Sequence, residues 1–291
     1  MTATPETAVP PLPDEISTGG VAPTGRGASG RSIWRRARTA VWRSSSVLAV
    51  LAAWQVLAMA LDNVMFLPRL EVIAVEAVDL YREGTLMPDL LISLQRALLG
   101  FAIAAVAGTL IGLAMGWFRT FETLMSPLVS LTYPVPKIGL IPLLILWFGV
   151  GEASKIAVIV AAAIYPVIIN VHAGVKSIDK RLLWRAQTLG AGKIEVFLRV
   201  VIPATLPTVF LGLRLAMGLS WILLFAAEMV ASNEGLGHMI IRAQQLFQTP
   251  TVFVALIVIG VLGFLFDMLV MFVARRSCRW HFERSAAALS Q

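Results

Sequence analysis

Six long apolar stretches dominate the pattern of hydrophobic and polar positions along this chain of 291 residues. They cover residues 44–62, 94–118, 123–150, 156–175, 204–230 and 251–274. A helix needs roughly 20 apolar residues to cross a bilayer core of about 30 Å, and each stretch is close to or above that length. None shows the two-residue alternation of a membrane β-barrel, and backbone groups in lipid must pair within their own segment. The pattern therefore predicts an all-α, polytopic membrane protein with six transmembrane helices.

The composition agrees with a membrane protein. Hydrophobic residues make up 58% of the chain and charged residues 14%, with a mean hydropathy of +0.81. A soluble domain has roughly 45–50% apolar and about 25% charged residues, so an ordinary soluble enzyme is excluded, as is a disordered or fibrous protein. The single cysteine, Cys278, excludes an internal disulfide framework and a thiolate metal cluster.

The basic residues indicate how the chain is oriented. They concentrate before residue 44, in the loop 176–203 and after residue 274, whereas four fall in segments on the other side of the membrane. Those four are Arg69, Arg82, Lys155 and Arg242. Cytoplasmic loops carry an excess of Lys and Arg, so both termini are predicted to be cytoplasmic. The same rule explains the 24 basic against 17 acidic residues without a nucleic-acid partner.

These assignments divide the chain into five parts. They are a disordered cytoplasmic tail (1–43), a first transmembrane helix (44–62), an extracytoplasmic segment (63–93), a core of five transmembrane helices with the cytoplasmic loop 176–203 (94–274), and a cytoplasmic C-terminal tail (275–291). Within the extracytoplasmic segment, the apolar spacing in residues 70–83 predicts a short amphipathic helix lying on the outer surface.

Two of the apolar stretches carry features of helix packing. Gly108, Gly112 and Gly116 recur every four residues, which lets a second helix approach closely, although glycine is also common in membrane helices generally. The stretch 123–150 contains four prolines, each of which removes a helix hydrogen bond, so we expect a helix bent around a cavity.

Four of the charged residues within the predicted spans are candidates for a solute pathway, because charge in a membrane is costly. They are Lys137, Arg214, Glu228 and Asp267. Cations would favour an anionic solute. The alternative is a set of structural ion pairs, such as Arg214 with Asp267 or Glu228 with Lys155.

The loop 176–203 has the pattern of two short helices. Asp179 can cap a helix over 180–189 that Gly190 ends, with Leu182, Leu183, Ala186 and Leu189 on one face. A second helix over 193–201 would bury Ile194, Phe197, Leu198 and Val201 and end before Pro203. Such a surface suits docking of another subunit, or a helix that lies on the membrane face.

The loop resembles the EAA loop in permease subunits of bacterial ABC importers. Gly190-Ala191 is followed by Val200 and then by Ile202-Pro203 at the spacing of that motif, while Trp184 and Arg185 stand at its first two positions. Further motifs are similar to the branch that imports sulfonates, taurine, nitrate or bicarbonate. They include Ser93-Leu94-Gln95-Arg96, Trp147-Phe148-Gly149, Ala227-Glu228, Glu234-Gly235-Leu236-Gly237 and Arg242 to Thr249.

The resemblance implies a homodimeric permease for a small anionic solute, first a sulfonate or taurine, with nitrate, bicarbonate or a pyrimidine-type precursor as alternatives. It implies an ATP-binding cassette subunit docked on the loop, an extracytoplasmic binding protein and the plasma membrane as location. The docking residues would be Asp179, Leu182, Leu183, Ala186, Leu189, Gly190 and Ala191. ATP and magnesium would bind the partner, since Gly190 to Lys193 lacks the first glycine and the final Ser or Thr of a P-loop. A secondary carrier working alone or an intramembrane enzyme would need inverted repeats or clustered His and acidic residues, which are not seen.

Overall fold

The computed structural model describes residues 28–278, with side chains from residue 45 onward. In that range every regular element is a helix, and the chain divides into two units, residues 1–53 and 54–291. The described part of the first unit belongs to helix α1 (Ala28–Leu61), which continues into the second unit. The all-α class predicted from the sequence is confirmed for these residues.

Helix α1 begins within the segment that the sequence assigned to a disordered tail. Residues 28–43 are helical in the structure, and residues 1–27 lie outside the described residues. The reason is local, because this part of α1 contains several Arg and Ala residues, which are good helix formers, and no proline.

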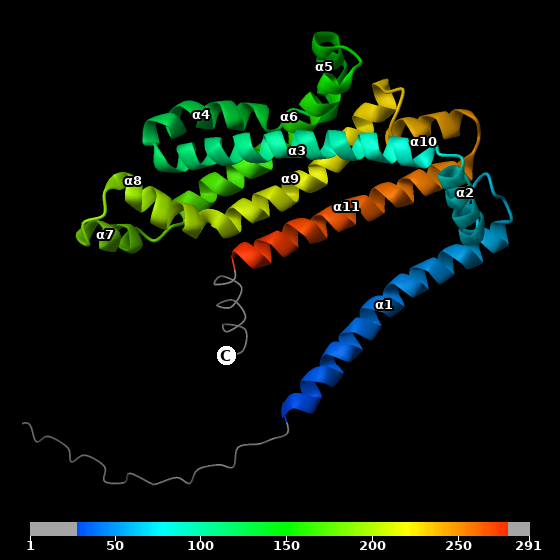
Figure 1. The fold of residues 1–291 in the computed structure, drawn as a ribbon, viewed down its shortest axis with the longest axis horizontal. Coiled ribbons are helices and arrows are strands. Elements are labelled where there is room, and N and C mark those ends of the chain that lie inside the picture. Colours follow the sequence, from blue (N-terminus) through cyan, green and yellow to red (C-terminus); the bar gives the residue numbers. More distant parts are fainter. Residues whose placement is uncertain (1–27, 279–291) are drawn as a thin grey trace, which may run out of the picture. The chain divides into compact units, whose positions relative to one another are not determined.

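Four long helices form the second unit. They are α3 (Leu86–Trp117), α6 (Glu152–Lys176), α9 (Ile202–Ala231) and α11 (Thr249–Ser277). Figure 1 shows α3, α6 and α9 side by side with α11 along α9, and the contacts between these helices agree. Helices α3 and α6 run in the same direction, whereas α9 returns antiparallel to both.

Helices α3 and α6 pack through a regular ladder of small residues against branched ones. Gly108 of α3 faces Val167 of α6, and Gly112 faces Val171 one turn further on. A Cβ atom added at Gly108 or Gly112 would lie 2.8 or 2.7 Å from the Cβ of the facing valine, which is closer than two non-bonded carbon atoms approach. Gly116 faces Val175 in the same way. The structure thus places the three glycines where the backbones of two helices come together.

The stretch 123–150 is two helices. Helix α4 (Arg119–Thr132) ends before two prolines, and a 3₁₀ turn, η1 (Lys137–Leu140), leads into α5 (Ile141–Phe148) at an angle of 90°. The break is sharper than a kink because Pro134 and Pro136 fall in a short linker that is not helical at all.

By length and composition, four of the described helices are able to cross a membrane, or five if the bent pair counts as one span. The four are the long helices named above, with α9 extended back to Lys193. The apolar part of α1, Ser45–Leu61, is shorter and would span about 26 Å at 1.5 Å per residue. The count of six spans and the sides of the termini stay predictions.

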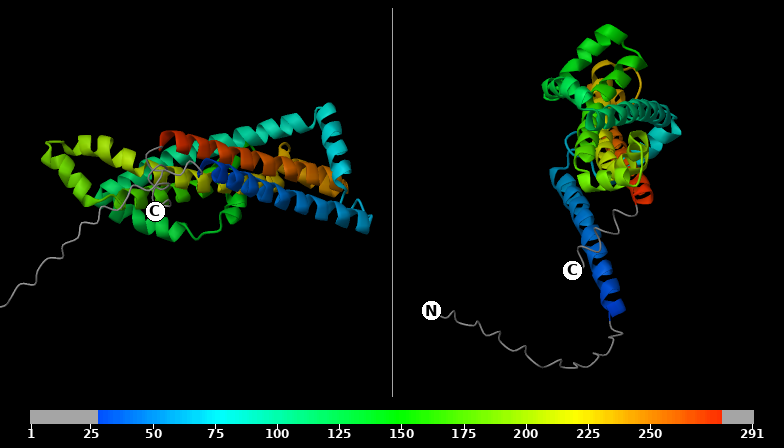
Figure 2. Two further views of the ribbon diagram at one scale, coloured as in Figure 1. Left: turned by 90° about the horizontal axis from the view of Figure 1, so that it is seen from below. Right: turned by 90° about the vertical axis from the view of Figure 1, so that its left-hand side faces the viewer.

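Short helices lie at the two ends of the long ones (Figures 1 and 2). At one end, α2 (Leu70–Arg82) packs against α11, and it matches the amphipathic helix predicted for residues 70–83. Beside it lies α10 (Leu236–Gln245), which the sequence analysis did not predict. At the other end are α7 (Lys180–Thr188) and α8 (Lys193–Val196), from the loop 176–203.

Candidate functional site

The loop 176–203 forms a capped helix followed by a tight turn. The side chain of Asp179 accepts a hydrogen bond from the backbone N–H of Arg181 at 2.8 Å, which caps α7. Helix α7 ends before Gly190, whose φ of +86° lies in the left-handed region that favours glycine. Both features agree with the sequence pattern.

The apolar face of α7 is divided between the bundle and the outside. Leu183 packs against the buried cluster that contains Val201, and α7 lies against α8. Ala186 is half-buried, whereas Leu182 is 50% exposed and Leu189 is 88% exposed. The helix is therefore anchored on one side and offers apolar side chains on the other, as a docking surface requires.

The second predicted helix of the loop does not end before Pro203. Helix α8 passes through a π turn, η2 (Phe197–Val201), directly into α9, so that one helix runs from Lys193 to Ala231. Pro203 has no N–H to donate to the carbonyl of Arg199, and the wider π turn occurs at this place. The prediction that Ile194 and Leu198 are buried is also wrong, since both are mostly exposed.

Lys137 closes the end of α4 at the helix break. Its Nζ donates hydrogen bonds to the carbonyls of Thr132, Tyr133 and Val135 at 2.6, 3.1 and 2.9 Å. The ammonium also lies 4.4 Å from the centre of the Tyr165 ring on α6. All three donors of the lysine are thus used on backbone groups that the proline-containing linker leaves without helical partners.

Glu228, near the end of α9, is 1% exposed and is paired with Arg96 of α3, not with Lys155. The Nη1 of Arg96 lies 2.8 Å from a Glu228 oxygen, and the same guanidinium binds Glu152 at the start of α6 in a bidentate pair with both distances 2.6 Å. Lys155 instead donates to the carbonyls of Val150 and Gly151. The proposed Glu228–Lys155 ion pair is therefore wrong.

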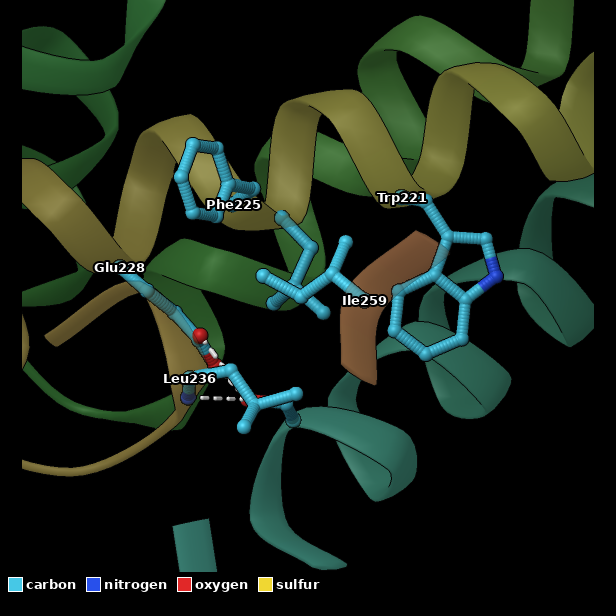
Figure 3. A pocket seen from close by; sticks show the side chains of 7 residues that line it. Trp221, Phe225, Glu228, Leu236 and Ile259 are labelled. Atoms are coloured by element: carbon cyan, nitrogen blue, oxygen red, sulfur yellow. Dashed lines mark hydrogen bonds between the residues drawn. The ribbon is translucent and has the colours of Figure 1, made fainter. Parts of the chain in front are cut away.

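The same carboxylate holds the turn between α9 and α10 (Figure 3). It accepts hydrogen bonds from the Ser93 hydroxyl and from the backbone N–H of Gly237 at 2.9 Å, while Ser93 accepts from the N–H of Leu236. Gly235, with φ of +108°, lets the turn fold over the carboxylate, since a Cβ there would meet its oxygens. We call Ser93, Arg96 and Glu228 the buried polar cluster. Together with Glu152, whose side chain is 54% exposed, it ties three long helices and α10 together.

Arg214 and Asp267 lie opposite each other on α9 and α11. The guanidinium donates from Nε and Nη2 to the two carboxylate oxygens at 2.6 and 3.0 Å. This bidentate geometry is the ion pair that the sequence analysis named as one of two alternatives for Arg214. Among the described residues, no group of His, Cys, Asp and Glu is arranged to hold a metal ion.

Sequence reasoning missed the central member of the buried polar cluster. Arg96 entered the analysis only as part of a resemblance, although a cation within an apolar helix needs a buried carboxylate as partner. Glu228 of α9, which was already a candidate residue, is that carboxylate.

Comparison with known proteins places this geometry in a family. The model of binding-protein-dependent transport system inner membrane components matches residues 104–277. The taurine transport system permease protein TauC of Escherichia coli is 34% identical over 82% of this chain and 90% of its own length. The formylaminopyrimidine transport permease protein ThiX of Halalkalibacterium halodurans is 32% identical over 75% and 87%.

The fold agrees with a solved structure as well. A chain of the MetNI methionine ABC transporter, in an inward-facing form, superimposes with a TM-score of 0.54 at 16% identity, covering 64% of this chain and 93% of that one. The chain therefore belongs to the family of binding-protein-dependent transport system inner membrane components, as a multi-pass permease subunit of an ABC importer in the inner membrane.

Proposed function

We propose that this permease imports a small organic anion, and that the solute is an aliphatic sulfonate such as taurine. The observation that carries the proposal is the 34% identity to a taurine permease across most of both chains. The resemblance of Trp147-Phe148-Gly149 and Arg242 to Thr249 to the sulfonate branch supports it. The chain is a non-enzymatic transport subunit, and importers of this family work with an ATPase and a binding protein.

The ATPase is proposed to dock on α7 and the turn that follows it. Supporting this, α7 is capped at one end, fixed to the bundle through Leu183, and exposes Leu182 and Leu189. The proposed contact set is Asp179, Leu182, Leu183, Ala186, Leu189, Gly190 and Ala191. ATP and magnesium are bound by the ATPase, two copies of this permease enclose the pathway, and a binding protein delivers the solute from outside.

Transport follows from alternating access. ATP binding changes the separation of the two ATPase subunits, α7 moves with them, and the long helices alternate between inward-open and outward-open arrangements. Such coupling needs contacts that differ between the two states.

The solute is tested by growth and uptake. A strain without the permease gene is expected to lose growth on taurine or alkanesulfonates as sole sulfur source, with growth on sulfate kept, and the gene restores it. Labelled taurine uptake should require both the ATPase and the binding protein. If the strain grows normally on every sulfonate but loses growth on nitrate, bicarbonate or a pyrimidine source, that compound replaces the sulfonate as the proposed solute. Uptake without the ATPase would show a secondary carrier.

The docking assignment is tested at Gly190. A Gly190→Pro variant should lose both co-purification of the ATPase and uptake, because proline fixes φ near −65° and removes the N–H that donates to Gln187. Gly192→Ala is the matched control, since Gly192 has φ of −68° and open space around it. Normal co-purification and uptake by Gly190→Pro would remove α7 as the docking site.

A further inference from the structure

A groove of about 270 Å³ lies between α4 and α6, away from the residues discussed for docking. One wall is a single face of α4, with Ser126, Ser130 and Tyr133 at helical spacing. The other wall is α6, with Ile168 and His172. Sites for drug-sized ligands measure roughly 300–1,000 Å³, so this groove suits a smaller solute.

The serine hydroxyls in the groove do not bond the backbone of their own helix. Several other helix hydroxyls do, as Thr123 donates to the carbonyl of Arg119 at 2.9 Å and Ser220 to that of Ala216 at 2.8 Å. Ser126 and Ser130 make no such bond, and within residues 45–278 neither hydroxyl has another hydrogen-bond partner. Ser126 is half-buried and Ser130 is exposed, so both hydroxyls are open to the groove. Two hydroxyls one turn apart that do not bond their own helix can donate to a polar occupant.

Each end of the groove carries a cationic or protonatable group. At one end the rings of Tyr133 and Tyr165 lie 6.2 Å apart, with the Lys137 ammonium over Tyr165. At the other end the Nε2 of His172 lies 2.9 Å from Glu122, whose second oxygen binds Lys176 at 2.5 Å.

No carboxylate lines the groove itself. Glu122, the carboxylate that His172 contacts, is paired with Lys176, so the unpaired charge beside the groove is the Lys137 ammonium, which favours an anion.

We propose that this groove is a binding site for a small organic oxyanion, of the sulfonate class, in the permease itself. The inference rests on the proposed function and extends it to a location. The hydroxyls of Ser126, Ser130 and Tyr133 donate hydrogen bonds to the oxyanion. Lys137 contributes charge at a distance, because its three N–H groups are already bound to carbonyls. The apolar side chain of Ile168 contacts the hydrocarbon part of the solute.

The test uses the full importer, purified with its ATPase and binding protein. Labelled taurine binding is measured on the complex without the binding protein, and taurine uptake is measured in proteoliposomes with it. The variant Ser126→Ala with Ser130→Ala should lower binding and uptake about tenfold, as loss of two hydrogen bonds of modest strength implies. Ser130→Thr, which keeps the hydroxyl, should retain most of the binding. Thr123→Ala is the matched control on the same helix, since its hydroxyl serves its own backbone.

Charge is tested by competition. Excess methanesulfonate should displace labelled taurine from the wild-type complex, whereas the neutral dimethyl sulfone should not. Displacement by the sulfone at equal concentration would overturn the assignment to an anion. The site would be overturned if the double serine variant bound and transported taurine as well as the wild-type importer does. The proposed function would then still stand. A wild-type importer that transports no sulfonate would instead overturn the proposed function.

Discussion

The Glu228 carboxylate offers the sharpest test of the packing described above. Replacing it by glutamine keeps the size of the side chain and removes its charge. The carboxylate accepts hydrogen bonds from the Arg96 guanidinium, the Ser93 hydroxyl and the N–H of Gly237, at 2.8 to 2.9 Å. The two oxygens of a carboxylate accept all three, whereas the NH₂ of an amide would face at least one of these donors.

The magnitude follows from burial. Arg96 and Glu228 have 3% and 1% of their side chains exposed, so solvent cannot compensate either group. Breaking a buried ion pair by removing one partner costs about 3–5 kcal/mol when the other charge is left unpaired. Arg96 keeps its bidentate pair with Glu152, so we expect the lower end of this range, about 3 kcal/mol. At about 2–4 °C per kcal/mol for a domain of this size, the Glu228→Gln unfolding midpoint should fall by about 10 °C.

The assay is thermal unfolding of the purified complex in one detergent, followed by the loss of its monodisperse elution. In the Glu228→Gln background, Arg96→Met should lower the unfolding midpoint less than it does in the wild type, because the two side chains are coupled. The control is Glu195→Gln, which removes an exposed pair with Arg199 and should shift the midpoint little. A Glu228→Gln midpoint within about 2 °C of the wild type, against the roughly 10 °C expected from a buried pair, would refute the reasoning.

Three further predictions follow from packing, pairing and burial. Gly112→Ala should destabilise the fold by about 1–3 kcal/mol, because its Cβ would clash with Val171. Val171→Ala in the same chain should recover part of this loss. An unchanged unfolding midpoint would contradict the glycine–valine packing of α3 and α6. Arg214→Gln should lower the yield of folded permease and addition of Asp267→Asn should restore it; equal yields of single and double variants would show that the pair is not structural. Cys278 is fully buried and burial raises the pKa of its thiol, so a maleimide should react slowly at neutral pH and faster as rising pH forms thiolate; rapid labelling of the native protein at pH 7 would contradict this.

The sequence predicts the long helices well because hydrophobic length is a one-dimensional property. It also identifies the cap at Asp179 and the stop at Gly190, since both depend on neighbouring residues. The partner of Glu228 could not be obtained in this way. Lys155 and Arg96 lie at similar depth on different helices, and the choice between them depends on how each helix is rotated about its axis.

Three other features that the sequence did not reveal have separate physical causes. Helix α10 carries Leu236, Met239, Ile240 and Ala243 at helical spacing, so its signal was present but short. The 90° bend at residues 133–136 was signalled by prolines, which indicate that a helix is interrupted but not by what angle. The free hydroxyls of Ser126 and Ser130 are visible only when the helices are packed, because serine in a helix usually bonds its own backbone.

The unbroken helix from Lys193 to Ala231 has a mechanical consequence. It contains 39 residues, which at 1.5 Å per residue make a rod of about 58 Å. A tilt of about 5° around one end of such a rod displaces the other end by about 5 Å. A push at Lys193 therefore reaches Glu228 without crossing a flexible linker. The rod can bend, instead of transmitting force, at the π turn Phe197–Val201 and at Pro207 inside α9.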